Sequence, residues 1–315
     1  MSNNGLVVVL GGGGARGLAH VGILEALTQH GFPVRAVAGT SIGAEVGAFF
    51  ASGFPMDELC RIGGAVDWRR TLQLFMPDLA RGGLCSGRKI LAFLRQHFGD
   101  RLIETLPIPW IGIATDLDSG EEVVLDRGIL ATAVRASISL PGLLAPYRLG
   151  DRLLIDGGVV NSLPIDVART RFGGPILAVL LQPIGPRGHA RRRRMPGWLS
   201  ARHVPHPAWI RRARPVRTGV EGGGDINWRT RWVMSQSASI TQAALIRLRL
   251  QQSPPDLLLN PEVRHIGPLE FYRGTEAIEA GRQEVRRRLP EIERLLVSGS
   301  SSLEPESGSN NPRSS

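Results

Sequence analysis

The chain has 315 residues, of which 42% are hydrophobic and 5% aromatic, and its formal net charge is +10 at pH 7. This length is enough for one large α/β domain or two small ones. No run of residues approaches the roughly 18 apolar positions that a membrane-spanning helix needs. The N-terminus also lacks the basic and apolar regions of a secretory signal. We therefore expect a cytoplasmic protein that meets lipid from the surface, as a peripheral protein at the inner face of the membrane.

The positive charge is confined to one stretch. Residues 186–232 contain 12 arginines and two acidic residues, whereas the segments before and after this stretch are each balanced. The same stretch holds five prolines and four of the six tryptophans. Arginine with tryptophan suits an anionic membrane interface, and it also suits stacking on single-stranded nucleic acid. Because the rest of the chain is neutral, nucleic-acid binding is disfavoured, which leaves peripheral membrane contact or a solvated insertion.

The first elements in chain order indicate a parallel α/β sheet. Residues 6–10 are apolar without interruption, as in a strand that is buried on both faces. Glycines at 11–14 follow, and then a helical pattern that ends near Gly31. A second strand over 34–38 leads through a turn at 39–43 into a helix that continues to about residue 52. This order predicts right-handed crossovers between parallel strands.

The later elements continue the alternation of strands and helices. We expect strands at 110–115, 122–125, 153–155, 176–181 and 257–260, and helices at 88–98, 129–137, 164–171, 235–251 and 275–289. The whole pattern predicts a core over 5–185, an irregular basic insertion over 186–232, C-terminal helices and a strand completing the core over 233–296, and a disordered tail over 297–315.

The glycine cluster after the first strand is the first chemical motif. It matches G-x-G-x-x-G through Gly12, Gly14 and Gly17, which would suit a dinucleotide. That motif needs an acidic residue about 20 positions later for the ribose, and no acid occurs between Glu25 and Glu45. The exposed N–H groups of such a loop can instead bind a phosphate or stabilise an oxyanion. A tight turn without chemistry is the remaining interpretation.

The second motif is a G-x-S-x-G pentapeptide made of Gly39, Thr40, Ser41, Ile42 and Gly43. The pentapeptide alone carries little weight, but here it lies between a predicted strand and a predicted helix. This context is that of a nucleophile elbow, in which flanking glycines permit a sharp turn that lifts the serine clear. A serine that only caps the helix is the alternative.

A nucleophilic serine needs a base, and the chain offers two kinds. His265 is the best late histidine for a triad, although its setting is not distinctive, and His20 reads as a structural histidine in the first helix. Asp156 ends a predicted strand before Gly157 and Gly158, where ligands meet the carboxyl ends of parallel strands. An aspartate that only caps this turn is the alternative. The two cysteines, Cys60 and Cys85, have no metal-binding spacing, and we expect neither a metal nor a cofactor.

Together and in this order, the three motifs resemble those of patatin-like phospholipases. Further blocks that look similar are Ala114-Thr-Asp116, Arg135-Ala-Ser137 and Gly158-Val-Val-Asn161, and the resemblance extends over residues 5–182. It implies an α/β fold with three αβα layers and a mainly parallel central sheet. It also implies a Ser–Asp dyad without histidine.

Residue by residue, the resemblance makes Ser41 the nucleophile and Asp156 its base. The N–H groups near Gly13, Gly14 and Ala15, within the loop Gly12–Gly17, would form the oxyanion hole, and Arg16 would brace that loop. The implied reaction is hydrolysis of a fatty-acyl ester of a phospholipid or lysophospholipid through an acyl-serine. Because an aspartate with an ordinary pKa near 3.9 is a weak base for serine, we expect a partly buried Asp156 with a raised pKa, within hydrogen-bond reach of Ser41.

Other functions stay open at this stage. An acyltransferase on the same scaffold would pass the acyl group to an alcohol instead of water. A nucleotide-binding protein would use the glycine-rich loop, and a lipid-binding module without activity would need neither Ser41 nor Asp156. Labelling by a serine-directed probe separates the hydrolase and the acyltransferase, which both need a reactive Ser41, from the other two functions.

Overall fold

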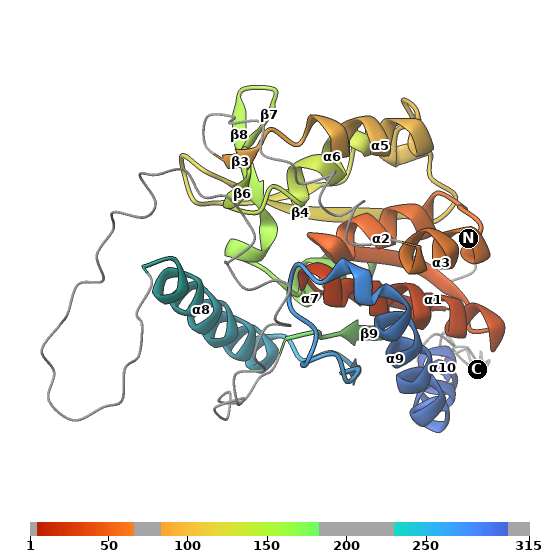
Figure 1. Cartoon of the computed structure of the whole chain (residues 1–315). Coiled ribbons are helices and arrows are strands. Elements are labelled where there is room, and N and C mark those ends of the chain that lie inside the picture. Colours follow the sequence, from red (N-terminus) through yellow and green to blue (C-terminus); the bar gives the residue numbers. More distant parts are fainter. Residues whose placement is uncertain (1–4, 66–82, 183–229, 302–315) are drawn as a thin grey trace, which may run out of the picture. The chain divides into compact units, whose positions relative to one another are not determined.

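A computed structural model describes residues 5–65, 83–182 and 230–301 of the chain (Figure 1). By internal contacts the chain divides into two compact units. One comprises Met1–Gln182 with Gln242–Ser315, and the other Pro183–Thr241. Most of the second unit, and with it the predicted basic insertion, lies outside the described residues.

The described residues contain a mixed sheet of eight strands, with helices between them. The strands are β1 (Leu6–Leu10), β2 (Val34–Thr40), β4 (Trp110–Asp116), β5 (Glu122–Leu125), β7 (Tyr147–Leu149), β8 (Arg152–Asp156), β9 (Ile176–Val179) and β10 (Leu257–Leu259). Their order is β10-β9-β1-β2-β4-β8-β7, and β5 also pairs with β4. The pairings from β10 to β4 are parallel, whereas those of β5, β8 and β7 are antiparallel. Two short strands, β3 (Gly83–Cys85) and β6 (Gly142–Leu144), pair separately.

Helices cover both faces of the sheet, which gives three layers. The helices are α1 (Ala19–Gln29), α2 (Ile42–Ala51), α3 (Met56–Gly64), α5 (Arg88–Phe98), α6 (Leu130–Ser137), α7 (Ile165–Phe172), α8 (Thr230–Gln252), α9 (Gly274–Arg287) and α10 (Leu289–Ser301). Short 3-10 turns lie at Gly14–Leu18, Ile103–Thr105, Gly157–Val159 and Phe271–Arg273. The three-layer αβα architecture predicted from the motifs is therefore present.

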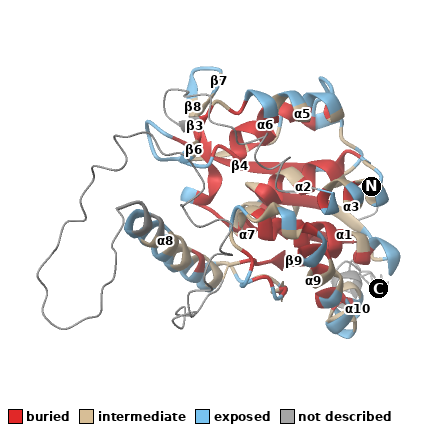
Figure 2. Ribbon diagram, viewed as in Figure 1, coloured by how far each residue is buried: buried red, intermediate tan, exposed pale blue. Residues whose placement is uncertain are grey.

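The two faces of the sheet are distinguished by alternation along β1, whose five residues are all 0% exposed. Leu6, Val8 and Leu10 pack in the large core with residues of α1, α2, α3, α5, α6, α9 and α10. Val7 and Val9 must face the other way, because successive side chains of a strand point to opposite faces. The buried side chains of α7 supply the smaller layer on that side. Figure 2 shows β4, α1 and α2 largely in the colour of buried residues, which places the core along the sheet.

Some elements differ from the sequence-based expectation. Helix α3 was not predicted. The short strands β3, β6 and β7 were not predicted either, because strands of three residues are too short to show an alternating pattern. Helix α10 continues to Ser301, so the first residues of the predicted tail are helical. Within the described ranges, no helix has the length and apolarity needed to span a bilayer.

Candidate active site

Strands β2 and β8 end against the same edge of β4. Strand β5 pairs with Gly112–Thr115, so β2, which faces Trp110–Ile113, must use the opposite edge of β4. Strand β8 faces Ala114–Asp116, overlaps β5 at two of these positions, and must share the edge used by β2. Because β2 runs parallel and β8 antiparallel to β4, the carboxyl ends of β2 and β8 meet head to head.

This arrangement brings the two residues of the predicted dyad together. Thr40 ends β2 opposite Ile113, and Asp156 ends β8 opposite the next residue, Ala114. Ser41 follows Thr40 directly and therefore lies beside Asp156. The expectation that Asp156 ends a parallel strand is wrong, because β8 is antiparallel to both of its neighbours.

The hydroxyl of Ser41 donates a hydrogen bond of 2.6 Å to Oδ2 of Asp156. The other carboxylate oxygen, Oδ1, accepts the backbone N–H of Gly158 at 2.7 Å. The hydroxyl of Thr115 bonds the backbone carbonyl of Asp156 at 3.0 Å. The predicted contact between Ser41 and Asp156 is thus present, and both oxygens of the carboxylate are oriented.

Burial changes the acidity of this carboxyl group. Asp156 is 3% exposed. Burial raises the pKa of Asp156 from 3.8 to about 6, and the hydrogen bonds from Ser41 and Gly158 oppose the rise. At neutral pH the group is still mostly ionised, yet it is a stronger base than an ordinary aspartate. The arrangement can therefore take a proton from the serine hydroxyl.

The elbow around Ser41 depends on glycines for close packing. Among the described residues, Ser41 is the only one besides glycine with a positive φ, at 57°. A Cβ at Gly43 would collide with the carbonyl of Leu10, and one at Gly39 would lie 2.5 Å from the backbone of Gly43. The two glycines of the pentapeptide therefore allow β1, β2 and α2 to approach, and the serine takes a conformation that costs about 1–3 kcal/mol.

The glycine-rich loop passes beside the nucleophile but offers fewer N–H donors than predicted. A Cβ at Gly12 would lie 3.6 Å from the Cβ of Ser41. The N–H of Gly12 donates to Ser162 O at 2.9 Å, and that of Ala15 donates to Pro268 O at 2.8 Å. These two groups are therefore not free to bind an oxyanion, which corrects the prediction for Gly12 and Ala15.

Gly13 and Gly14 retain the ability to stabilise negative charge. In the described part of the chain, neither backbone N–H has a hydrogen-bond acceptor, and both residues keep partial exposure. Gly17 has a different role, since a Cβ there would collide with the side chain of Ile42 in the elbow. The candidate oxyanion hole thus reduces to two adjacent amides.

Arg16 and His20 support this loop from inside. Nε of Arg16, which is 8% exposed, donates to Ile266 O at 2.7 Å, so the predicted bracing residue holds the loop to the C-terminal part of the chain. His20 is fully buried, and its Nε2 bonds the carbonyl of Gly11 at 2.8 Å. Burial lowers the pKa of His20 to about 4, so the ring is neutral and Nε2 is the donor. This geometry confirms the structural interpretation of His20.

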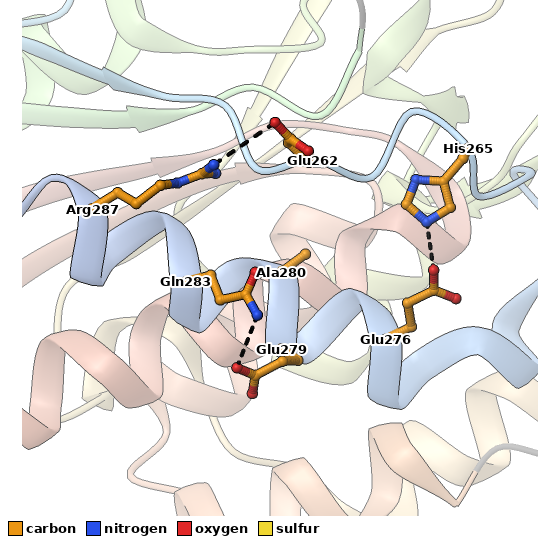
Figure 3. A pocket seen from close by; sticks show the side chains of 7 residues that line it. All are labelled: Glu262, His265, Glu276, Glu279, Ala280, Gln283 and Arg287. Carbon is orange, nitrogen blue, oxygen red and sulfur yellow. Dashed lines mark hydrogen bonds and ion pairs between the residues drawn. The ribbon is translucent and has the colours of Figure 1, made fainter.

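No histidine among the described residues is hydrogen-bonded to Ser41. His265, the late candidate for a triad, bonds Oε1 of Glu276 at 2.5 Å and is about half exposed. It lines a cavity of about 290 Å³ beside α9, where Arg287 also pairs with Glu262 (Figure 3). That cavity shares no lining residue with the dyad. His189, His203 and His206 lie outside the described residues.

Two further groups near the dyad were not singled out by sequence reasoning. The hydroxyl of Ser137 accepts the backbone N–H of Ser41 at 3.0 Å, although Ser137 had been noted only within a similar block. The hydroxyl of Thr40 donates to Asn161 O at 2.8 Å, which joins the elbow to the turn after Asp156. Buried hydroxyls that bond distant backbone groups leave no local pattern in a sequence, so only the block as a whole could have drawn attention to them.

Glu45 is the other residue that the sequence did not indicate. It lies one turn after Ser41, and its N–H donates to Ser41 O at 3.0 Å. Its half-buried side chain has no hydrogen bond or ion pair within the described residues. Burial raises the pKa of Glu45 from 4.5 to about 7. A carboxyl group that titrates near physiological pH therefore belongs to the first turn of the helix that follows the nucleophile.

Comparisons with known proteins identify the family of this chain. The family model for patatin-like phospholipases matches residues 8–169. An uncharacterized NTE family protein of Mycobacterium tuberculosis is 31% identical over 91% of this chain and 92% of its own length. Patatin-like phospholipase domain-containing protein 7 of Rattus norvegicus is 38% identical over 57% of this chain, a match that spans 14% of the rat protein. The structure of VipD from Legionella pneumophila aligns with a TM-score of 0.45 at 14% identity, covering 94% of this chain and 67% of that one.

Proposed function

The chain belongs to the patatin-like phospholipase family, and on this premise we propose that it hydrolyses fatty-acyl esters with a Ser–Asp dyad. Family membership supports a lipid acyl hydrolase. The finer assignment is that Ser41 attacks the ester carbonyl of a phospholipid or lysophospholipid and Asp156 accepts its proton. The observation that carries it is the hydrogen bond of 2.6 Å from the Ser41 hydroxyl to the buried carboxylate.

In the acylation half of the reaction, Ser41 Oγ forms a bond to the carbonyl carbon of the ester. Its proton passes to Oδ2 of Asp156, and the carbonyl oxygen becomes an oxyanion. The free N–H groups of Gly13 and Gly14 are the donors available to that oxygen. Collapse of the intermediate breaks the bond to the leaving alcohol, which takes the proton from Asp156. The acyl-serine and the free lysolipid or glycerol derivative result.

Deacylation repeats these steps with water. Asp156 takes a proton from the water as its oxygen attacks the acyl carbon, and the same proton returns to Ser41 Oγ when the fatty acid leaves. The bond from Gly158 N–H to Oδ1 keeps the carboxylate in one orientation throughout. A single carboxylate can serve as base and acid because its pKa of about 6 is close to the working pH.

An alcohol in place of water would make the same acyl-serine a transferase intermediate. This second function is tested by adding glycerol or a lysolipid to the assay and analysing the products. Acylated acceptor in excess of free fatty acid would favour transfer over hydrolysis. The glycine-rich loop supports nucleotide binding less well, since two of its amides are bonded within the protein.

Labelling with a fluorophosphonate probe tests the dyad. We expect wild type to be labelled, Ser41→Ala not to be labelled, and Asp156→Asn to react at least about a hundredfold more slowly. The matched control is Asp126→Asn, because Asp126 is a partly buried aspartate that bonds Arg171 at 3.0 Å instead of a serine. Labelling that survives Ser41→Ala, or an unaltered rate for Asp156→Asn, would reject the assignment.

The composition of residues 186–232 supports peripheral binding to anionic membranes as part of this proposal. Such a protein would act in the cytoplasm at the inner face of the membrane. Deleting the segment should weaken binding to vesicles that contain anionic lipid and spare hydrolysis of a soluble short-chain ester. Unchanged sedimentation with vesicles would contradict this part of the proposal and leave the dyad untouched.

A further inference from the structure

We infer that Ser137 is a positioning residue for the nucleophile. Its buried hydroxyl holds the backbone of Ser41 in the strained conformation that presents Oγ to Asp156. This inference rests on the proposed function and adds a residue that never touches substrate. It is carried by the contacts of one side chain that joins the elbow to β4 and α6.

The hydroxyl of Ser137 donates one hydrogen bond and accepts another. Ser137 is 0% exposed, and its Oγ donates to the carbonyl of Ile113 at 2.6 Å. A serine hydroxyl has one proton and two lone pairs. Because the proton is used on Ile113, Oγ can meet the N–H of Ser41 only as an acceptor, and it does so at 3.0 Å. The direction of both bonds is therefore fixed.

This bond acts at the residue where the backbone needs support. Ser41 has φ 57° and ψ −126°, a conformation that residues with a side chain seldom adopt and that persists only when neighbouring structure enforces it. As the residue before α2, Ser41 has no helical acceptor for its own N–H. Without Ser137 the amide would lose its partner, and the backbone would be freer to rotate away from this φ.

The anchor is shared with the other half of the dyad. A Cβ at Gly157 would collide with the same carbonyl of Ile113 that Ser137 binds, so the turn after Asp156 is packed against it. Two residues beyond Ser137, the carbonyl of Ser139 accepts the N–H of Asp156 at 3.0 Å. The nucleophile and the base are thus both held in place by contacts with β4 and with the end of α6.

Arg135 makes this end of α6 rigid. Its side chain is 1% exposed and has no acidic partner among the described residues. Instead it donates to Ser139 Oγ at 2.6 Å and to the carbonyls of Ser86 and Ala145 at 2.9 and 3.0 Å. A buried guanidinium that bonds Ser139, Ser86 and Ala145 fixes the end of α6, where Ser137 is the last helical residue.

The test compares two buried serines. Ser137→Ala removes the anchor, and Ser52→Ala is the matched control. Ser52 is the residue after α2, it is 9% exposed, and among the described residues its hydroxyl bonds only the carbonyl of Phe49, at 2.7 Å. On a soluble short-chain ester we expect Ser137→Ala to lower kcat about a hundredfold with KM within about threefold of wild type, since small displacements of a reacting group have effects of this size. The rate of fluorophosphonate labelling should fall in parallel.

The conservative variant separates positioning from folding. Ser137→Thr keeps the hydroxyl and should recover at least about tenfold of the lost kcat, while Ser52→Ala should keep the wild-type value. If Ser137→Ala loses its secondary structure, Ser137→Cys takes its place, because the thiol fills the position of the hydroxyl without leaving a cavity but is a weak hydrogen-bond acceptor. A kcat per folded molecule within about threefold of the Ser52→Ala value would overturn the inference.

Failure of the inference is distinguishable from failure of the proposed function. If wild type is neither labelled at Ser41 nor active on esters, the dyad itself is rejected. If wild type is active and the variant without the Ser137 oxygen is equally active, only the positioning role is rejected. A drop in kcat that accompanies a large rise in KM would also contradict positioning, because it would indicate a damaged binding surface.

Discussion

The raised pKa of Asp156 leads to a specific dependence of activity on pH. If the carboxylate is the base and its pKa is about 6, about one molecule in eleven is active at pH 5 and about ten in eleven at pH 7. The value of kcat/KM on a soluble ester should therefore be about tenfold lower at pH 5 than at pH 7.5. An aspartate with its ordinary pKa of 3.8 would lose less than a tenth of its ionised form over the same range.

The assay is kcat/KM from pH 4.5 to 8, because this quantity reports groups of the free enzyme. Circular dichroism at each pH excludes acid unfolding as the cause of a fall. Glu45→Gln is the necessary control, since Glu45 also titrates near neutrality, with a pKa of about 7. The acid limb must persist in this variant. A flat profile between pH 5 and 8, or a limb near pH 4, would refute the assignment of a buried Asp156 as the base.

Two further predictions concern stability. Because the pKa of folded Glu45 is raised from 4.5 to about 7, the folded state binds more protons than the unfolded state in that window, and the free energy of unfolding falls as pH rises through it. Glu45→Gln should thus raise the free energy of unfolding more at pH 8 than at pH 5, by about 1–3 kcal/mol since the side chain is partly exposed. An equal effect at the two pH values, measured by denaturant unfolding, would contradict this. Gly43→Ala should destabilise the protein by about 3 kcal/mol and abolish labelling, since its Cβ would meet the Leu10 carbonyl. The control is Gly64→Ala, whose Cβ would meet only the hydroxyl of Thr275, at 3.3 Å. Equal melting temperatures for the two variants would contradict this prediction.

Motifs with local causes could be predicted from the sequence. The pentapeptide around Ser41 predicted a sharp turn because its glycines stand where side chains would collide, and Gly43 against Leu10 shows that collision. The continuous apolar run of β1 predicted burial on both faces, and its residues are fully buried. In each case the pattern lies within five consecutive residues, so it is visible in the sequence even where, as for Gly43 and Leu10, the contact that it permits is with a distant segment.

The oxyanion loop shows where prediction from local sequence stops. The glycines indicated exposed N–H groups, but the sequence could not show that the amide of Ala15 donates to Pro268, more than 250 positions away. A distant segment thus removes one donor from the predicted set and braces Arg16 through Ile266. The number of amides left for an oxyanion is decided by tertiary contacts, whereas the presence of a flexible glycine loop is decided locally.

The convergence of the dyad follows from the direction of β8, which the sequence-based expectation had wrong. If β8 had run parallel to β4, it would have had the same direction as β2. Its amino end, and not Asp156 at its carboxyl end, would then have faced the end of β2. The observed reversal lets β2 and β8 share one edge, with Thr40 opposite Ile113 and Asp156 opposite Ala114. Two strand ends that abut in this way place adjacent side chains within hydrogen-bond distance without any long loop. The antiparallel pairing that contradicted the expectation is therefore the feature that explains the 2.6 Å contact between Ser41 and Asp156.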